Sequence, residues 1–164
     1  MANPQILERV DIFSDLDLEQ LESICDVCKE VVYFQGELIF AENSPSTEFY
    51  VILEGEVAIE IDPDLVGTGA EVHPPGTIAI LHPGQSFGEI ALVDQGLRSA
   101  SARCNTMLCK VLAISREDLM RLLQNNYEMG FIVMSNLARE LCLKIRLSNL
   151  NMREALFYIP RDQS

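Results

Sequence analysis

One stretch of the sequence brings together residue types that are suited to binding a small anion. It reads FGEIALVDQGLRSASA and covers residues 87–102, with Gly88 and Glu89 at its start and Arg98 and Ser99 near its end. An arginine guanidinium can bind a phosphate through two parallel hydrogen bonds, and a serine hydroxyl adds another donor. A carboxylate repels a phosphate, but it can accept a hydrogen bond from a ribose hydroxyl. Together these residue types predict a site for a nucleotide with one exposed phosphate.

The residues between the two charged positions indicate how they are brought together. Gly88 permits a sharp turn and lets a ligand approach without a Cβ in the way. Residues 89–92 fit one short helical turn, whose free N–H groups attract an anion. The Asp-Gln-Gly sequence at 94–96 then reverses the chain. We therefore expect Arg98 to return beside the start of the helical turn.

Each charged residue also has an ordinary structural interpretation. Arg98 could be a turn arginine that pairs with Glu89 or with a solvated neighbour. Glu89 could be an acidic residue that stabilises the first turn of a helix. The sixteen-residue pattern as a whole favours the ligand site over these separate interpretations.

The segment before this stretch predicts N-terminal helices over residues 4–28. The sequence SDLDLEQLESICDVC begins with Ser14, a candidate N-cap, and has acidic residues in the turns that follow. Its leucines, Ile24, Cys25 and Cys28 recur near helical spacing.

Residues 29–114 read as a series of short strands separated by glycine-rich turns. The segments EVVYF, ELIFA, EFYVIL, GEVAIEI, TIAIL and MLCKVLAI are rich in β-branched and aromatic residues. Val57, Ile59 and Ile61 alternate with other residues, which is typical of a half-buried strand. Many short strands with frequent turns indicate a barrel or a jelly roll. The stretch from Asp62 to Gly76, with three prolines and three glycines, predicts a mobile hairpin loop.

Residues 115–159 read as C-terminal helices. Ser115 and Asp118 form a capping-box pattern, and a long helix is expected from about Tyr127 toward Ile159, before Pro160. One apolar stripe recurs at spacings of four and three residues: Met134, Ala138, Leu141, Ile145, Ser148 and Met152. A second stripe contains Leu143, Leu147 and Leu150. The helix could pack on its own domain alone, but two stripes favour a homodimer through the first.

The stretch 87–102 closely resembles the phosphate-binding cassette of the cyclic-nucleotide-binding domain family, of the type found in the catabolite activator protein and in regulatory subunits of protein kinase A. The resemblance covers most of the chain. GELIFAENSPSTEFYVILEGEVAI is similar to the family's paired-glycine hairpins, with Gly36 and Gly55 in place, and LHPGQSFGEIAL is similar to its turn into the cassette. Asn43 stands where the family often has glycine, and asparagine tolerates the left-handed conformation.

This resemblance implies a fold and a set of binding roles. The fold is α+β and mainly β: a double-stranded β-helix, or jelly-roll-like β-roll, with N-terminal helices and a long C-terminal helix, in one domain over residues 1–164. Gly88 and Glu89 would hold the ribose. The phosphate would bind the amides of Ile90 and Ala91 together with Arg98 and Ser99. In the family the long helix supplies base contacts, and Glu140 and Lys144 stand at those positions here.

The charge of the chain limits its direct partners. It carries 25 acidic and 12 basic residues, a formal net charge of −13, which argues against direct binding to nucleic acid or to an anionic membrane surface. No apolar run reaches the ~18 residues of a transmembrane helix, and the N-terminus has no signal-peptide pattern. An odd number of cysteines, five, indicates reduced thiols in the cytoplasm.

No constellation of residues predicts catalysis or a bound metal. Cys25 and Cys28 form a CxxC pair, which could be half of a metal site or a redox pair, but no second pair or nearby histidine accompanies it. We expect core cysteines there and at 104 and 109. A metalloenzyme on a similar β-roll would need clustered histidines, and His73 and His82 are isolated. We therefore expect no cofactor and no enzymatic activity.

The sequence thus favours a cytoplasmic sensor domain that binds a cyclic mononucleotide, cAMP ahead of cGMP, and signals through its C-terminal helix as a homodimer. A different hypothesis is an interaction or dimerisation module with a vestigial pocket, and a third is a small metalloenzyme. Since the chain ends at Ser164, we expect either a stand-alone sensor or a fragment of a longer protein without room for a helix-turn-helix.

Overall fold

The computed structural model of the chain describes residues 3–62 and 76–157, and within α4 it does not describe the side chains of residues 154–156. The predicted hairpin loop at 62–76 lies almost wholly outside the described residues, as do the last two residues of the predicted long helix and Pro160. The two histidines divide in the same way: His82 is described and His73 is not.

Within the described residues, the strands form two four-stranded antiparallel sheets, which confirms the predicted jelly-roll-like fold. One sheet has the order β1-β8-β3-β6, and the other has the order β2-β7-β4-β5. The strands of the first sheet are β1 (Cys28–Phe34), β8 (Leu108–Ser115), β3 (Glu48–Glu54) and β6 (Ser86–Phe87). Those of the second sheet are β2 (Leu38–Phe40), β7 (Ser101–Cys104), β4 (Val57–Ile61) and β5 (Gly76–Leu81).

The central strand β3 is buried on both faces, so its side chains belong to two different cores. Phe49 and Val51 join a cluster with the helices, whereas Tyr50 and Ile52 point into the interior of the roll. This alternation follows from the two-residue period of a strand. One face of β3 therefore packs against the helical layer, and the other face packs inside the roll.

The predicted alternation in β4 is only partly correct. Val57 is buried and Ile59 is partly buried, as expected, but Ala58 is also buried and Ile61 is 40% exposed. The register between β4 and β5 shifts between Ile59 and Glu60, so the regular pattern does not extend to the end of the strand.

The N-terminal helices are shorter than the predicted range of 4–28. They comprise α1 (Pro4–Leu7), the 3₁₀ helix η1 (Asp11–Phe13) and α2 (Leu18–Cys25). The N-cap of α2 is Asp17 and not Ser14, because Asp17 and Gln20 form a reciprocal capping box. Cys28 was expected at the end of a helix and is instead the first residue of β1.

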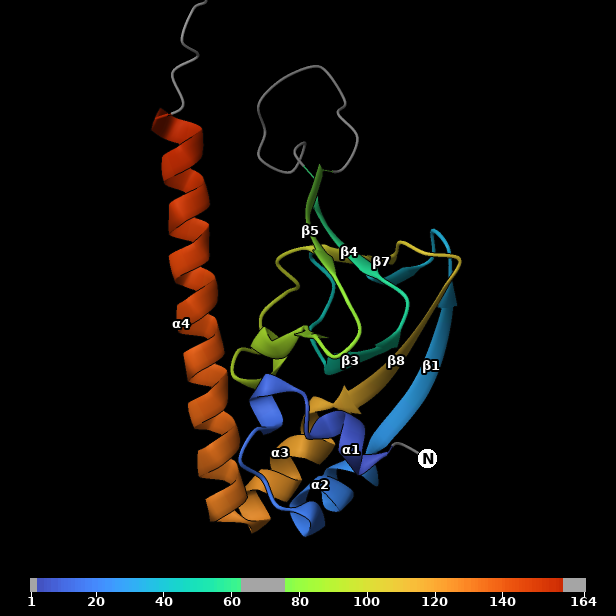
Figure 1. Ribbon diagram of the computed structural model, residues 1–164, viewed down its shortest axis with the longest axis vertical. Coiled ribbons are helices and arrows are strands. Elements are labelled where there is room, and N and C mark those ends of the chain that lie inside the picture. Colours follow the sequence, from blue (N-terminus) through green and yellow to red (C-terminus); the bar gives the residue numbers. More distant parts are fainter. Residues whose placement is uncertain (1–2, 63–75, 158–164) are drawn as a thin grey trace, which may run out of the picture.

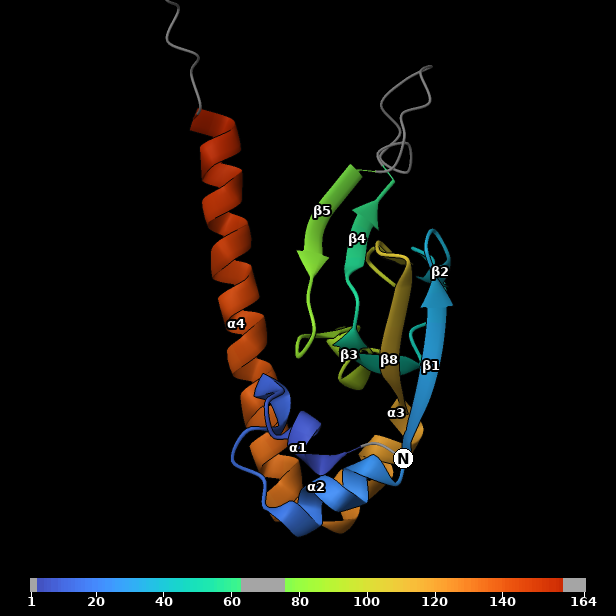
Figure 2. The same cartoon turned by 45° about the vertical axis from the view of Figure 1, so that its right-hand side comes forward.

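Two C-terminal helices follow the roll. The helix α3 (Arg116–Asn125) begins after Ser115, whose hydroxyl oxygen accepts from the Asp118 amide as predicted. The helix α4 (Tyr127–Phe157) starts in the helical layer at the base of the roll and rises along its side (Figures 1 and 2). Among the described residues, no helix is long and apolar enough to span a membrane.

The two halves of α4 differ in their packing. Its first half places Met129, Val133 and Leu137 in the core that includes α1, η1 and α2. Met134 and Leu141, expected in a seam between two chains, are partly buried against this same core and so pack within their own chain. Further along, Ile145 is 61% exposed and Met152 is 56% exposed.

Candidate functional site

A cavity of about 290 Å³ lies where the stretch 87–102 meets the roll and α4. The lining residues from that stretch are Phe87, Gly88, Glu89, Ile90, Asp94, Gly96, Leu97, Arg98, Ser99 and Ala100. The roll adds Phe40, Ser46, Ile59, Ala79 and Leu81, and α4 adds Lys144. The structure therefore brings Gly88, Glu89, Ile90, Arg98, Ser99 and Lys144 together around one space.

Gly88 makes the turn that opens the site. Its φ is +75°, in the left-handed region that side chains rarely adopt. A Cβ at this position would lie 2.6 Å from Nη1 of Arg98 and 3.2 Å from the carbonyl oxygen of Glu48. Only glycine fits here without displacing the arginine. The 3₁₀ helix η3 (Glu89–Leu92) follows at once, which confirms the predicted short helical turn.

Arg98 is a buried cation with no carboxylate partner. Its exposed fraction is 5%, and no carboxylate lies within ion-pairing distance in the part of the chain that the structure describes. Its Nη2 donates to the carbonyl oxygen of Glu48 at 2.7 Å, whereas its Nε is buried and has no hydrogen-bond partner. Burial lowers the pKa of Arg98, yet a guanidinium stays charged at physiological pH. A buried cation of this kind is costly unless an anion pairs with it.

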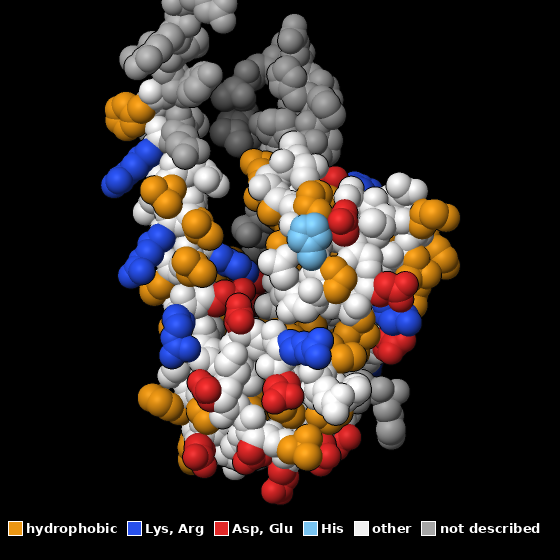
Figure 3. Space-filling model, in the orientation of Figure 1, with side chains coloured by type: hydrophobic (Ala, Val, Ile, Leu, Met, Phe, Trp, Pro, Cys, Tyr) orange, Lys and Arg blue, Asp and Glu red, His pale blue; other side chains and the backbone are white. Residues whose placement is uncertain are grey.

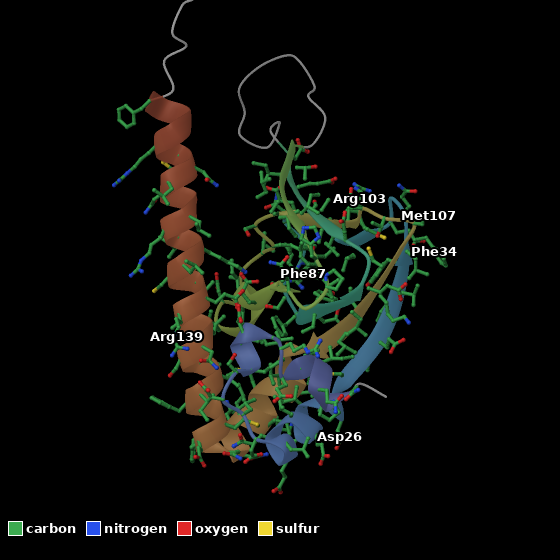
Figure 4. The ribbon with its side chains drawn as sticks, viewed as in Figure 1. Asp26, Phe34, Phe87, Arg103, Met107 and Arg139 are labelled. Atoms are coloured by element: carbon green, nitrogen blue, oxygen red, sulfur yellow. The ribbon has the colours of Figure 1, made fainter. Side chains whose placement is uncertain are left out.

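Two aromatic rings contact the guanidinium of Arg98, and no motif in the sequence indicated these contacts. The guanidinium carbon of Arg98 lies 4.0 Å from the ring centre of Phe40 and 5.7 Å from that of Tyr50. Tyr50 stacks on Phe87 with ring centres 5.0 Å apart, and Figure 4 shows Phe87 inside the roll. The hydroxyl of Tyr50 donates to Glu48 at 2.6 Å. Phe40 lies on β2 and Tyr50 on β3, so only the fold places these two rings beside Arg98.

Glu89 is held by α4 and not by Arg98. Lys144 donates to Oε1 of Glu89 at 2.7 Å and lies 2.8 Å from Oε1 of Glu140. The ordinary interpretation that pairs Arg98 with Glu89 is therefore wrong. Burial favours the neutral form of Lys144, but the Glu89 and Glu140 carboxylates outweigh it and raise the pKa of Lys144 above its usual value. Glu140 does not line the cavity, and its Oε2 is buried without a partner.

The two backbone amides expected at the phosphate differ in their bonding. The Ala91 amide donates to the carbonyl of Gly88 at 3.1 Å, and Ala91 is fully buried and does not line the cavity. The prediction of a free Ala91 donor is therefore wrong in this arrangement. Ile90 does line the cavity, and its amide donates to no backbone or side-chain acceptor among the described residues.

Four of the five cysteines behave as packing residues, and Cys142 is exposed. Cys25 and Cys28 are free thiols packed partly against the helical core, and burial raises the pKa of Cys28 to about 12. Cys104 and Cys109 are buried in the core of the roll, as predicted. Within residues 3–62 and 76–157, no group of three or more His, Cys, Asp or Glu side chains is arranged to hold a metal ion.

Comparisons with a family model and with individual relatives agree on one family. The family model described as cyclic nucleotide-binding domain matches residues 30–126, more than half of the chain. The cAMP-dependent protein kinase regulatory subunit of Schizosaccharomyces pombe is 31% identical over 125 residues, which cover 76% of this chain and 27% of that protein. The CRP-like cAMP-activated global transcriptional regulator of Mycobacterium tuberculosis is 27% identical, over 93% of this chain and 63% of that protein. The chain thus spans less than two thirds of the length of these relatives.

Solved structures agree with the sequence comparison. The crystal structure of the catabolite activator protein of Thermus thermophilus superposes with a TM-score of 0.72 at 28% identity. The match covers 90% of this chain and 63% of that one.

Proposed function

The chain belongs to the cyclic nucleotide-binding domain family, and we propose that it is a regulatory module that binds a cyclic mononucleotide in the cavity beside Arg98. The observation that carries the proposal is the buried Arg98 guanidinium, which faces the cavity without a carboxylate partner among the described residues. A ligand phosphate would supply the charge that this cation lacks within its own chain.

The proposed roles follow the geometry of the cavity. Arg98, Ser99 and the Ile90 amide hold the cyclic phosphate. Gly88 has no Cβ, so the ligand can approach the backbone closely there. Glu89 accepts from the ribose 2′-hydroxyl through Oε2, since Lys144 already binds Oε1. An Ala91 role at the phosphate would require the η3 turn to open.

We propose cAMP ahead of cGMP, because both relatives described above carry cAMP in their names. The base would face α4 near Lys144, and Glu140 would act through that lysine. The Lys144–Glu140 ion pair offers few hydrogen bonds that could distinguish adenine from guanine. The preference between cAMP and cGMP should therefore stay below about a hundredfold, roughly 2.8 kcal/mol. A larger preference would show that other residues read the base.

Calorimetric titration tests the proposal directly. The unmutated chain is titrated with cAMP, cGMP and the acyclic 5′-AMP, and Arg98→Ala should weaken binding of the cyclic ligands about ten- to a hundredfold. Arg103→Ala is the matched control, because Arg103 pairs with Glu60 and does not line the cavity. Equal affinities for Arg98→Ala and the unmutated chain would contradict the site. No heat with any nucleotide would instead favour an assembly module whose cavity is unused.

Signalling through α4 is the second part of the proposal. Lys144 of α4 lines the cavity, and it joins α4 to the Glu89 carboxylate. A ribose that engages Glu89 would change the interactions open to Lys144. Binding then favours one position of α4 over another, which a ligand can do only if it contacts the two states differently.

We also propose a homodimer through α4, using the exposed and uncharged part of the predicted stripe at Ala138, Ile145 and Met152. Replacing Ile145 and Met152 together by Glu should yield monomers, because the carboxylates would be desolvated between two chains. Light scattering after gel filtration measures the mass. Asn151→Glu adds a charge on another face of the helix and should leave the mass unchanged. A monomeric unmutated chain at high micromolar concentration, with and without nucleotide, would contradict the dimer.

The proposed module is not catalytic, and we place it in the cytoplasm. The five free cysteines support a reducing compartment.

A further inference from the structure

A stripe of alternating arginine and leucine runs along the exposed C-terminal half of α4. Arg139, Leu143, Arg146, Leu150 and Arg153 follow one another at spacings of four, three, four and three residues. At about 100° per residue these positions share one face of the helix, roughly 80° wide. We call this set the Arg/Leu stripe. Leu143 is 56% exposed and Leu150 is 53% exposed, and all three arginines are exposed.

The stripe runs along the edge of α4, and its first three members, Arg139, Leu143 and Arg146, line a hollow that Asp11 and Ser14 also line. Figure 3 shows Lys or Arg side chains along the outer edge of α4 with hydrophobic side chains between them, and Figure 4 shows Arg139 on the same helix. Lys144 is on a different face of α4, where it reaches the cavity. The stripe is therefore separate from the proposed nucleotide site.

The arginines of the stripe have no acidic partner within the described part of the chain. Arg139 donates to the side-chain oxygen of Asn136 at 2.9 Å, and neither Arg146 nor Arg153 forms an ion pair there. Residues 139–153 contain four basic side chains and one acidic side chain, although the whole chain has a net charge of −13. This part of α4 is thus a local positive region on an acidic protein.

The spacing and the charge together define what could cover the stripe. A three-four repeat matches the side of a second helix, because such a repeat keeps one seam facing a partner. A copy of this chain would oppose arginine with arginine, which costs free energy across a desolvated seam. A lipid surface favours helices whose apolar and basic residues lie on separate faces, and here they share one. The net charge of the chain also opposes an anionic membrane.

We propose that the Arg/Leu stripe is a docking surface for an acidic amphipathic helix of another protein. That helix presents apolar residues to Leu143 and Leu150 and Asp or Glu to the three arginines. Its seam is opposite in charge to the stripe, so the pair is favoured over either self-pair. The surface is independent of the uncharged face at Ile145 and Met152 that we assign to the homodimer.

A synthetic helix tests the proposal with the full chain. The probe is a fluorescent peptide of about three heptads (~21 residues) in which Leu and Glu alternate at four- and three-residue spacing. One control peptide has the same composition in scrambled order, and another has Lys in place of Glu. Fluorescence anisotropy should give a Kd on the order of 10–100 μM for the acidic probe alone, weaker at ~300 mM than at ~50 mM salt.

Variants of the chain locate the binding surface. Arg146→Glu with Arg153→Glu should weaken binding of the acidic probe at least about tenfold and improve binding of the lysine peptide. Leu150→Gln should weaken binding severalfold, whereas Asn151→Glu, on another face, should change it less than about twofold. Circular dichroism confirms that each variant keeps its helix content.

Several outcomes would overturn the proposal. They are no binding of the acidic probe at ~1 mM, equal binding of the acidic and lysine peptides, or an unchanged Kd in the double arginine variant. Binding of the unmutated chain to vesicles of phosphatidylcholine and phosphatidylglycerol, without binding to the acidic probe, would assign the stripe to a membrane. Loss of a dimer in Arg146→Glu with Arg153→Glu, measured by light scattering, would assign it to a second copy of the chain.

Discussion

The cavity at Arg98 and the C-terminal half of α4 are incomplete in opposite ways. In the cavity a charged group is buried with too few partners, since Arg98 is 5% exposed and its Nε lacks a hydrogen bond. On α4 apolar groups are exposed with too little cover, as Leu143 and Ile145 show. A buried cation selects a small anion, whereas an exposed apolar and basic face selects a macromolecule. The first region fits the nucleotide site that we propose, and the second fits the docking surface that we propose.

Lys144 is the contact that joins the two regions. It lies at the start of the exposed half of α4 and binds the buried Glu89 of the cavity at 2.7 Å. Its side chain is 44% exposed, so the ion pair is partly screened by solvent. A weak link of this kind can be exchanged for a ligand contact without unfolding either region.

Gly88→Ala should have the largest effect, and it should be confined to the cavity. Left-handed strain and the contact with Arg98 Nη1 should together lower the free energy of unfolding by about 2 kcal/mol and weaken nucleotide binding at least about tenfold. Gly84→Ala is the matched control, because its φ is +88° but a Cβ there would meet nothing within 4 Å. It should show the strain alone and keep the affinity. Denaturant unfolding and calorimetry measure the two quantities. If Gly88→Ala keeps its full nucleotide affinity, the claim that this glycine is needed to position Arg98 is wrong.

Glu89→Ala should have a smaller effect that depends on the sugar. Loss of a charge-assisted hydrogen bond should weaken a cyclic ribonucleotide about tenfold, with little change for its 2′-deoxy analogue. Competition binding with both ligands measures the difference. If the two ligands lose affinity equally, Glu89 acts through the shape of the cavity and not through the ribose.

Lys144→Met should remove the ion pair that joins α4 to the cavity, and so test whether the two regions depend on each other. The ion pair is half exposed, so we expect backbone hydrogen exchange in the C-terminal half of α4 to become at most about fivefold faster, with only a few-fold change in nucleotide affinity. Lys110→Met is the control, because Lys110 pairs with Glu30 and Glu54 outside the cavity. Unchanged exchange throughout α4 would remove Lys144 as the link.

The smallest effect concerns pH. Because the neighbouring carboxylates raise the pKa of Lys144, the charged pair should contribute its full stabilisation below the ordinary lysine pKa of about 10.4 and lose it as pH rises through the higher folded value. Between about pH 7 and 9 we expect no loosening of α4 from this source. NMR of ¹³C-labelled lysine should show Lys144 titrating above the ordinary lysine value of about 10.4. Glu89→Ala should move the titration back toward the ordinary value, and a Lys144 pKa below the ordinary value of about 10.4 would contradict the assignment.

Local sequence was enough to predict the core of the cavity. Gly88, the short helical turn and Arg98 lie within eleven residues, so glycine geometry and chain reversal largely decide how they meet. Asn43 has φ +62°, at the position where the family resemblance suggested a residue that tolerates the left-handed conformation. The N-cap of α2 shows the limit of local patterns, because Ser14 and Asp17 both fit the cap preference and only the reciprocal bond with Gln20 selects Asp17.

The tertiary structure decided which distant residues complete the site and which faces of α4 remain free. Phe40 and Tyr50 support Arg98 because the strands that carry them meet only in the folded roll. The resemblance to the family made Lys144 a candidate base contact, but its pairing with Glu89, 55 positions away, depends on where α4 lies against the roll. Periodicity also gave Met134 and Ile145 the same stripe, although one packs on its own chain and the other is exposed. A sequence pattern records spacing along one element, whereas the choice between neighbours depends on how the elements pack against each other.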